Sequence, residues 1–275
     1  MFKPLVSVNI PIYQGERFLE QTIKSVLDQT YQNFEIVLII DGTNDRSEEI
    51  IKKCQEKYPK KIRYQWQKNV GLAQTRNNLI KLSKGEYIAI LDQDDYWKKD
   101  KLEKQIALFE KKPELGLVFS SITYINEKNE EIGEYHGKMY RGYIFNELYT
   151  DYFIPCPTII FKKELINKIG YFDPAYKYFE EVDFAQKASL FYEFDYLSES
   201  TCFYRKHENN TSNNDALWAY ERYKCKKNIY HYAKRHKFPI LYESKIKKEI
   251  MRFFLIHLRT QFLKIGRVFI LKGAK

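Results

Sequence analysis

Short apolar runs and segments of helical periodicity alternate through the first 91 residues, and this alternation restricts the possible folds more than any other feature of the sequence. The apolar runs predict strands at residues 5–10, 34–40, 62–66 and 87–91. The segments between them predict helices at residues 16–29, from 45 to about 58, and at 72–82. Strands and helices in strict alternation predict an α/β fold with a mostly parallel central sheet and helices on both faces.

The second half of the chain has a less regular pattern. It predicts strands at residues 117–125 and 158–161, a polar loop or hairpin at 127–142, and a helix at 182–191. From about residue 214 the pattern is helical, basic and aromatic to the end. No stretch of 18 uncharged apolar residues occurs, so we expect no segment that spans a bilayer.

Polar residues follow three of the predicted parallel strands, at residues 11–14, 41–45 and 92–95. In an open parallel sheet, ligands bind beyond the carboxyl ends of the strands. Residues 92–95 read Asp-Gln-Asp-Asp, and carboxylates this close together suit a hard divalent cation that also binds phosphates. Neither a Walker lysine nor a GxGxxG motif accompanies them, which disfavours P-loop and dinucleotide-binding proteins.

Ten short segments add specific motifs to this pattern. They are residues 6–13, 25–31, 34–36, 41–45, 69–73 with Arg76 and Asn77, 84–89, 91–97, 170–173, 180–183, and 204–207 with Asn210 and Ser212. In this order they resemble the motifs of the family 2 glycosyltransferases of the GT-A fold, over about residues 4–212. The segment 91–97 is similar to the DxD motif of that family.

The resemblance implies a nucleotide-sugar site and a metal ion, Mn²⁺ or Mg²⁺, that binds the donor diphosphate. The implied nucleotide-sugar contacts are Pro11, Tyr13, Asp41, Arg76, Asp92 and Gln93. The implied metal ligands are Asp94, Asp92 and His207. Asp95 is expected either to orient the metal ligands without binding the metal itself or to cap a helix beginning at Lys98.

The carboxylate of Asp41 accepts hydrogen bonds, so it suits a base with a ring N–H. Uracil and thymine offer N3–H and guanine offers N1–H, whereas cytosine presents an acceptor there. The resemblance implies uracil or thymine. A UDP-sugar is therefore the expected donor, and a dTDP-sugar, as in rhamnosyl transfer, is the alternative.

The acidic cluster of Glu180, Glu181 and Asp183 is the expected source of the general base. An inverting transfer is a single displacement, in which one carboxylate takes the proton of the acceptor hydroxyl. The family has Asp as the base at the position that Glu181 occupies here, so the base is either Glu181 or Asp183, with Glu180 orienting the acceptor. Two further departures are Gln14 for the usual Asn and Ile40 for the first Asp of a pair.

The basic charge of the chain is concentrated at its end. The formal net charge is +10, and residues 201–275 hold 18 Lys and Arg against 5 Asp and Glu. One helical face there is apolar, comprising Met251, Phe254, Leu255, Leu258, Phe262, Ile265 and Phe269, while Arg252, Arg259, Lys264 and Arg267 lie off it. Such a helix suits either an anionic membrane surface or packing against the protein. Its aromatic residues follow helical spacing rather than forming a stacking platform, so we expect no nucleic-acid partner.

Two parts are therefore expected: a GT-A catalytic domain at residues 1–212 and a helical, basic amphipathic extension at 213–275. Four dispersed cysteines and a first strand at the N-terminus predict a cytoplasmic protein without a signal peptide, with the inner face of the cytoplasmic membrane as a possible site of attachment.

The expected function is inverting, metal-dependent sugar transfer to a glycan or lipid-linked acceptor of a bacterial surface polysaccharide, such as lipopolysaccharide or capsule. A nucleotidyltransferase and a non-catalytic glycan-binding relative are the alternatives.

Overall fold

The computed structural model describes residues 3–272 except 209, 211–214 and 242, and it leaves out the side chains of 215–217 and 259–272. Ser212 and the side chains of Arg259, Phe262, Lys264, Ile265, Arg267 and Phe269 therefore lie outside the described residues.

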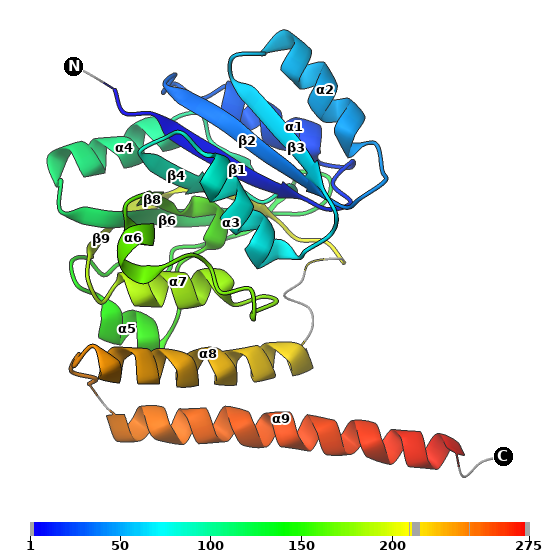
Figure 1. Ribbon diagram of the computed structural model, residues 1–275, viewed down its shortest axis with the longest axis vertical. Coiled ribbons are helices and arrows are strands. Elements are labelled where there is room, and N and C mark those ends of the chain that lie inside the picture. The colour runs from blue at the N-terminus through cyan, green and yellow to red at the C-terminus, as the bar shows by residue number, and fades with distance from the viewer. Residues whose placement is uncertain (1–2, 209, 211–214, 242, 273–275) are drawn as a thin grey trace.

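The described residues form one α/β unit in which a single nine-stranded sheet has the order β3-β2-β1-β4-β8-β6-β9-β5, with β7 paired to β6 (Figure 1). The strands are β1 (Val6–Ile12), β2 (Phe34–Asp41), β3 (Ile62–Gln67), β4 (Tyr87–Ile90), β5 (Tyr96–Trp97), β6 (Leu115–Ile125), β7 (Glu131–Tyr135), β8 (Ile160–Lys162) and β9 (Glu193–Arg205).

Strands β3, β2, β1 and β4 are parallel, as the alternating pattern predicts. Strands β6 and β9 are also parallel to each other, whereas β8, β5 and β7 pair antiparallel with their neighbours. The helices are α1 (Leu19–Leu27), α2 (Ser47–Lys57), α3 (Leu72–Leu82), α4 (Lys101–Lys111), α5 (Phe145–Thr150), α6 (Leu165–Ile169), α7 (Glu180–Ala188), α8 (Asp215–Arg235) and α9 (Glu243–Lys272), with a 3₁₀ turn at Cys156–Thr158.

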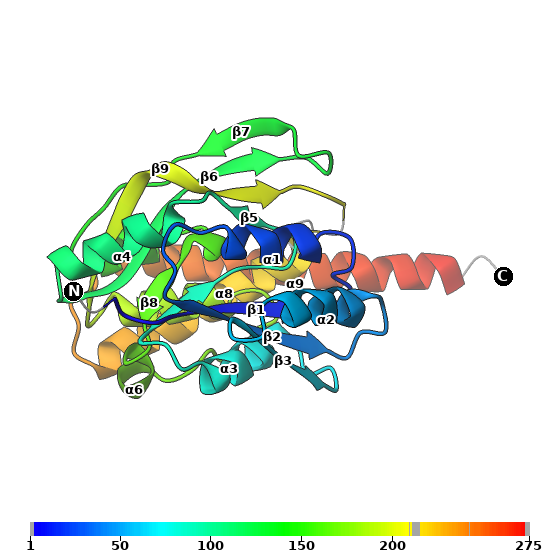
Figure 2. The same ribbon diagram turned by 90° about the horizontal axis from the view of Figure 1, so that it is seen from above.

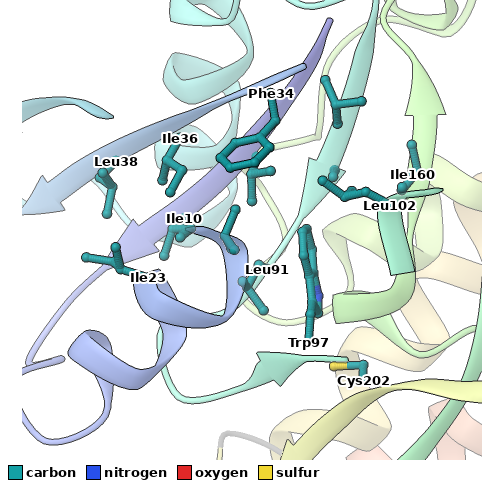
Figure 3. Close-up of a cluster of buried hydrophobic side chains, with 14 of the residues drawn as sticks. Ile10, Ile23, Phe34, Ile36, Leu38, Leu91, Trp97, Leu102, Ile160 and Cys202 are labelled. Atoms are coloured by element: carbon teal, nitrogen blue, oxygen red, sulfur yellow. The ribbon is translucent and has the colours of Figure 1, made fainter. Parts of the chain in front are cut away.

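Apolar side chains bury both faces of the sheet. Helices α1, α2 and α4 pack on one face, and Figure 3 shows part of this core, where Ile10, Ile23 and Phe34 lie together. Helices α3 and α6 (Figure 2) and α7 (Figure 1) pack on the other face. Strand β2 faces both: Ile36, Leu38 and Ile40 join the first core, while Val37 and Ile39 pack with α3. This is why its sequence is a nearly continuous apolar run.

Strand β9 is the main element that the sequence pattern does not predict. It is 13 residues long, but Ser198, Glu199 and Ser200 interrupt its apolar residues, and its register with β6 shifts near Ser200. The predicted helix start at Lys98 is also wrong, because α4 begins at Lys101. The expectation of a hairpin after β6 is confirmed by β7.

Helices α8 and α9 form an antiparallel pair on the outer side of α5 and α7, with α9 outermost (Figure 1). A third apolar core joins them to the rest of the chain, and in it Cys225, Ile229 and Ala233 of α8 pack with Phe179 and Val182. Contacts therefore cross the expected division at residue 212. Within the described part of the chain, no helix is both long and apolar enough to cross a membrane.

Candidate active site

A cavity of about 910 Å³ opens at the carboxyl ends of β1, β2 and β4. Seven of the predicted site residues line it, namely Pro11, Tyr13, Asp41, Asp92, Gln93, Asp94 and His207. The other four, Arg76, Glu180, Glu181 and Asp183, are not among its lining residues. The sheet edge thus brings the expected nucleotide and metal residues together, while the expected catalytic carboxylates form a separate cluster.

Asp41 lies at the end of β2, buried under the loop that leads into α3. Its carboxylate accepts hydrogen bonds from the backbone N–H of Val70 at 2.9 Å, from the N–H of Gly71 at 3.0 Å, and from Gln67 Nε2 at 2.8 Å. A carboxylate offers about four acceptor positions, so roughly one is left for a ligand. Gly42 makes this approach possible, because it has φ +75° and a Cβ there would lie 2.6 Å from the backbone nitrogen of Asn69.

Gln93 binds the chain at the end of β1 rather than projecting freely. Its Oε1 accepts from the N–H of Tyr13 at 2.8 Å, and its Nε2 donates to the carbonyl of Tyr13 at 2.7 Å. The next residue, Gln14, has φ +55°, a left-handed conformation that Asn adopts more readily than Gln. The sequence departs from the resembled motif at Gln14, and the two hydrogen bonds of Gln93 fix the residue directly before it.

All four residues of the acidic turn after β4 line the cavity, but the Asp94 side chain is partly exposed whereas Asp95 is buried. Asp94 Oδ2 lies 2.8 Å from His207 Nε2, and both residues line the cavity. Asp95 is buried, and its Oδ1 accepts from the backbone N–H of Arg205 at 2.8 Å. Burial, reinforced by the nearby charges of Asp94 and Asp92, raises the pKa of Asp95 well above its usual range. Asp95 therefore joins this turn to β9 and does not cap α4.

Arg76 is buried between two carboxylates instead of facing the cavity. It donates from one nitrogen to Asp92 Oδ1 at 2.7 Å and from the other to Glu180 Oε1 at 2.5 Å. Its Nε and the second oxygen of Glu180 are buried without a hydrogen-bond partner among the described residues. Arg76 thus connects the sheet edge at Asp92 to the first turn of α7.

Glu181 and Asp183, the two candidate bases, have different surroundings. The side chain of Glu181 is 17% exposed, and burial together with the adjacent Glu180 raises its pKa well above the usual range, against the opposing charge of Arg76. Asp183 is only 1% exposed and lies 2.6 Å from Lys187 Nζ. Burial also raises the pKa of Asp183, while Lys187 lowers it.

The sequence reasoning did not assign residues 174–178 to the site, although all five line the cavity. They read Pro-Ala-Tyr-Lys-Tyr and lead directly into Glu180. Two tyrosines immediately before an acidic helix start are the signal that could have identified them, because aromatic side chains are common in ligand sites. Arg17 and Phe18 are further lining residues that were not singled out.

The donor set fits a divalent metal ion in part. Asp94 supplies a carboxylate oxygen and His207 an imidazole nitrogen, at the same point of the cavity wall, and Mn²⁺ accepts both kinds of ligand. Within the described residues, no group of three or more His, Cys, Asp or Glu side chains could hold a metal ion. Asp94 and His207 are therefore the two candidate ligands that the described residues bring together at this point.

The comparison with protein families identifies the class of protein. The model of the family described as glycosyl transferase family 2 matches residues 7–170. An uncharacterised glycosyltransferase of Methanocaldococcus jannaschii is 31% identical over 74% of this chain and 72% of the relative. The chain belongs to glycosyl transferase family 2 and is a glycosyltransferase.

Other relatives match over shorter stretches. An uncharacterised glycosyltransferase of Rickettsia felis is 41% identical over 56% of this chain, which spans only 25% of that relative. TuaG of Bacillus subtilis, a glycosyltransferase named for teichuronic acid biosynthesis, is 41% identical over 38% of this chain and 42% of its own.

Solved structures share the fold. TarS of S. aureus in complex with UDP-GlcNAc has a TM-score of 0.69 at 21% identity, over 92% of this chain and 72% of that one. The mannosyltransferase PcManGT of Pyrobaculum calidifontis, in complex with GDP-Man and Mn²⁺, has a TM-score of 0.64 at 15% identity, over 98% of this chain and 81% of that one. These similarities confirm the predicted GT-A fold.

Proposed function

We propose that the chain transfers a sugar, with inversion, from a UDP-sugar to a hydroxyl of a glycan or lipid-linked acceptor in bacterial surface polysaccharide synthesis. The observation that carries this proposal is the shared cavity of Asp41 and Asp94, with the carboxylate cluster of α7 joined to it through Arg76 and Asp92. The similarity to TarS, which was solved with UDP-GlcNAc, and to TuaG supports the donor and the acceptor class.

The nucleotide end of the donor is assigned to Asp41. Its carboxylate is already oriented by Val70 and Gly71, and its remaining acceptor position matches the ring N–H of uracil. Because the two backbone donors keep the carboxylate fixed, little ordering is needed when the nucleotide binds. A thymine base presents the same N–H, so a dTDP-sugar remains the alternative donor.

The diphosphate end is assigned to Asp94 and His207, which would hold Mn²⁺ or Mg²⁺ together with phosphate oxygens, with Asp92 nearby. The ion, when bound, neutralises charge that develops on the leaving nucleoside diphosphate. Arg205 holds the backbone of this turn, since its Nε donates to the carbonyl of Asp94 at 2.9 Å. The chain thereby positions Asp94 through β9.

Glu181 is the general base that the surroundings favour, because its side chain is more exposed than that of Asp183 and is not committed to a lysine. In the transfer, the acceptor oxygen forms a bond to C1 of the sugar and the bond from C1 to the phosphate oxygen breaks. The electron pair leaves with the nucleoside diphosphate, and the acceptor proton goes to the Glu181 carboxylate. A raised pKa makes Glu181 a stronger base once it is ionised.

The experiment that tests this function is a donor panel. The purified chain is incubated with UDP-GlcNAc, UDP-Glc, GDP-Man or dTDP-rhamnose, with Mn²⁺ and with excess EDTA, and release of the nucleoside diphosphate is measured. We expect release from a UDP-sugar and loss of that release in EDTA. Release from GDP-Man alone, or undiminished release in EDTA, would contradict the donor or the metal assignment.

The basic tail is proposed to bind an anionic membrane surface. In the described part of α9, Met251 and Leu255 are exposed, whereas Ile246 is buried in the core shared with α8. One face of the helix therefore packs on the protein, and another presents apolar and basic side chains. Sedimentation with phosphatidylglycerol vesicles should exceed that with phosphatidylcholine vesicles and should fall at high salt; equal sedimentation with both would contradict the proposal.

A further inference from the structure

Residues 174–178 form a wall of the cavity and lead into the carboxylate cluster, yet they belong to no helix or strand of the sheet. A segment without regular structure has few hydrogen bonds of its own to fix its position. Contacts with other elements must therefore hold this wall in place. The contacts of residues 174–178 lead to α8.

Glu221 of α8 binds the backbone of this segment. Its Oε2 accepts from the N–H of Lys177 at 2.8 Å and from the N–H of Tyr178 at 3.1 Å. The Glu221 side chain is almost fully buried, with 4% of the residue exposed. Hydrogen bonds from backbone N–H groups to a buried carboxylate are stronger than those between neutral groups.

Two more residues of the same helix contact the segment, and a third contacts the residue that follows it. Lys224 Nζ donates to the carbonyl of Ala175 at 2.5 Å, and Asn228 Nδ2 donates to the hydroxyl of Tyr176 at 2.8 Å. The ring of Trp218 packs edge-on against Phe179, with centroids 4.8 Å apart. Side chains along α8, from Trp218 to Asn228, thus hold residues 175–179.

Helix α8 is itself firmly attached. Ile229 and Ala233 are buried in the core that α8 shares with α7, and the Tyr149 hydroxyl of α5 donates to the carbonyl of Lys226 at 2.7 Å. Lys226 Nζ returns a hydrogen bond to the carbonyl of Tyr149 at 2.9 Å. The helix can therefore serve as a fixed support for the wall.

We propose that Glu221 is a positioning residue of the transfer reaction: by fixing the backbone at Lys177 and Tyr178, it keeps the wall of the cavity and the start of α7 in the geometry that the acceptor hydroxyl and Glu181 require. This inference rests on the proposed function. It assigns a role in the reaction to a helix in the expected C-terminal extension, outside the motifs of the family.

Loosening the wall changes the surroundings of Glu181 in a measurable way. The titratable and charged groups near Glu181 are Glu180, Arg76 from α3, Asp92 from the sheet edge, Cys156 from the 3₁₀ turn, Tyr152, and Cys225 from α8. Burial is the main reason that its pKa is raised. A more mobile wall admits water, so the pKa of Glu181 should fall and the acidic limb of the kcat profile should move to lower pH.

The test compares Glu221→Ala, Glu221→Gln and the control Glu243→Gln. Alanine removes the acceptor oxygen, whereas glutamine retains one on a side chain of the same length. Glu243 also supports α8, but it binds Tyr230, Lys234 and Lys247 and has no hydrogen bond to the wall among the described residues. For each variant we measure kcat and KM for the donor that the wild type uses fastest, the pH profile of kcat, and amide hydrogen exchange of residues 174–179.

We expect Glu221→Ala to exchange faster at Lys177 and Tyr178 and to lose about 10- to 100-fold in kcat, with the donor KM within about twofold. The acidic limb should move to lower pH, and Glu221→Gln should recover most of the kcat. A kcat and pH profile for Glu221→Ala equal to those of Glu243→Gln would overturn the proposal. If Glu221→Ala does not fold, the double variant Lys224→Met and Asn228→Ala takes its place, with the same criteria. Absence of turnover in the wild type on every donor would instead overturn the proposed function, and with it the role of Glu221.

Discussion

Under the proposed function the cavity has a donor side and an acceptor side, and the two walls are built in different ways. On the donor side, loops at the ends of parallel strands bind one another, as Gln93 binds Tyr13 and Asp41 binds Val70 and Gly71. On the acceptor side, residues 174–178 depend on hydrogen bonds to α8, a helix about 40 residues further along the chain. The donor side is thus fixed by the sheet, whereas the acceptor side is fixed by an element that the sheet does not include.

The charges of the two sides differ as well. Carboxylates on the donor side face either backbone donors, as Asp41 does, or a possible metal ligand, as Asp94 does with His207. On the acceptor side, the adjacent Glu180 and Glu181 are buried and partly buried, and desolvation raises the pKa of both. Under the proposed function, the arrangement separates the group that would bind the leaving diphosphate from the group that would accept the proton, and each can be tested separately.

Asp94→Ala should have the largest effect on the donor side. We expect kcat to fall by about 10³-fold or more, because charge on the leaving group then lacks its main stabilisation. The melting temperature should change little, since the Asp94 side chain is at the cavity surface. The exposed Asp28→Ala, outside the cavity, is the control. Retained turnover in Asp94→Ala would remove the metal assignment.

Glu181→Gln is the corresponding test on the acceptor side. The amide cannot accept the proton, so kcat should fall by about 10²- to 10⁴-fold while the Kd for UDP stays nearly unchanged. In the wild type, the raised pKa of Glu181 predicts that kcat falls as the pH drops through that pKa, because the carboxylate becomes protonated. Asp183→Asn is the matched variant. If it loses activity and Glu181→Gln does not, then Asp183 is the base.

Arg76→Met should uncouple the two walls, because Arg76 binds Asp92 on the donor side and Glu180 on the acceptor side. Removing one partner of a buried ion pair leaves an uncompensated charge, and the free energy of unfolding should fall by about 3–5 kcal/mol. Urea denaturation measures this change. Arg46→Ala, which breaks the exposed pair with Glu16, should cost less than about 1 kcal/mol. Equal losses of unfolding free energy in the two variants would show that the ion pairs of Arg76 do not stabilise the contact between the two walls.

Replacing Lys101, which is buried behind the donor side, should give the smallest effect, a change in how the free energy of unfolding depends on pH. Its Nζ lies 2.6 Å from Gln105 Oε1, and burial lowers its pKa to about 7, against about 10.4 in an unfolded chain. Between these values the unfolded chain binds a proton that the folded chain does not, so this residue makes stability rise with pH, by about 1 kcal/mol per pH unit. Subtracting the unfolding free energy of Lys101→Met from that of the wild type at pH 7, 8 and 9 isolates the effect. Exposed Lys99→Met is the control, and a difference independent of pH would show that Lys101 stays charged.

The sequence predicts the donor side better than the acceptor side, for a physical reason. Asp41 and Asp94 follow strands whose apolar runs are unambiguous, and the parallel order brings their ends together. The interrupted run of β9 hides a strand that supports the site through Arg205. The contact from Glu221 to residues 177–178 links distant parts of the chain, and no local pattern signals it.

Because α8 supports one wall and the sheet supports the other, the two choices that a glycosyltransferase makes lie on separate stretches of this polypeptide. Under the proposed function, the nucleotide is chosen by loops within the first 95 residues, and the recipient hydroxyl is met by residues 174–183 on their helical support. A substitution in α8 that loosens this support would then impair transfer to the acceptor while the nucleotide loops stay intact.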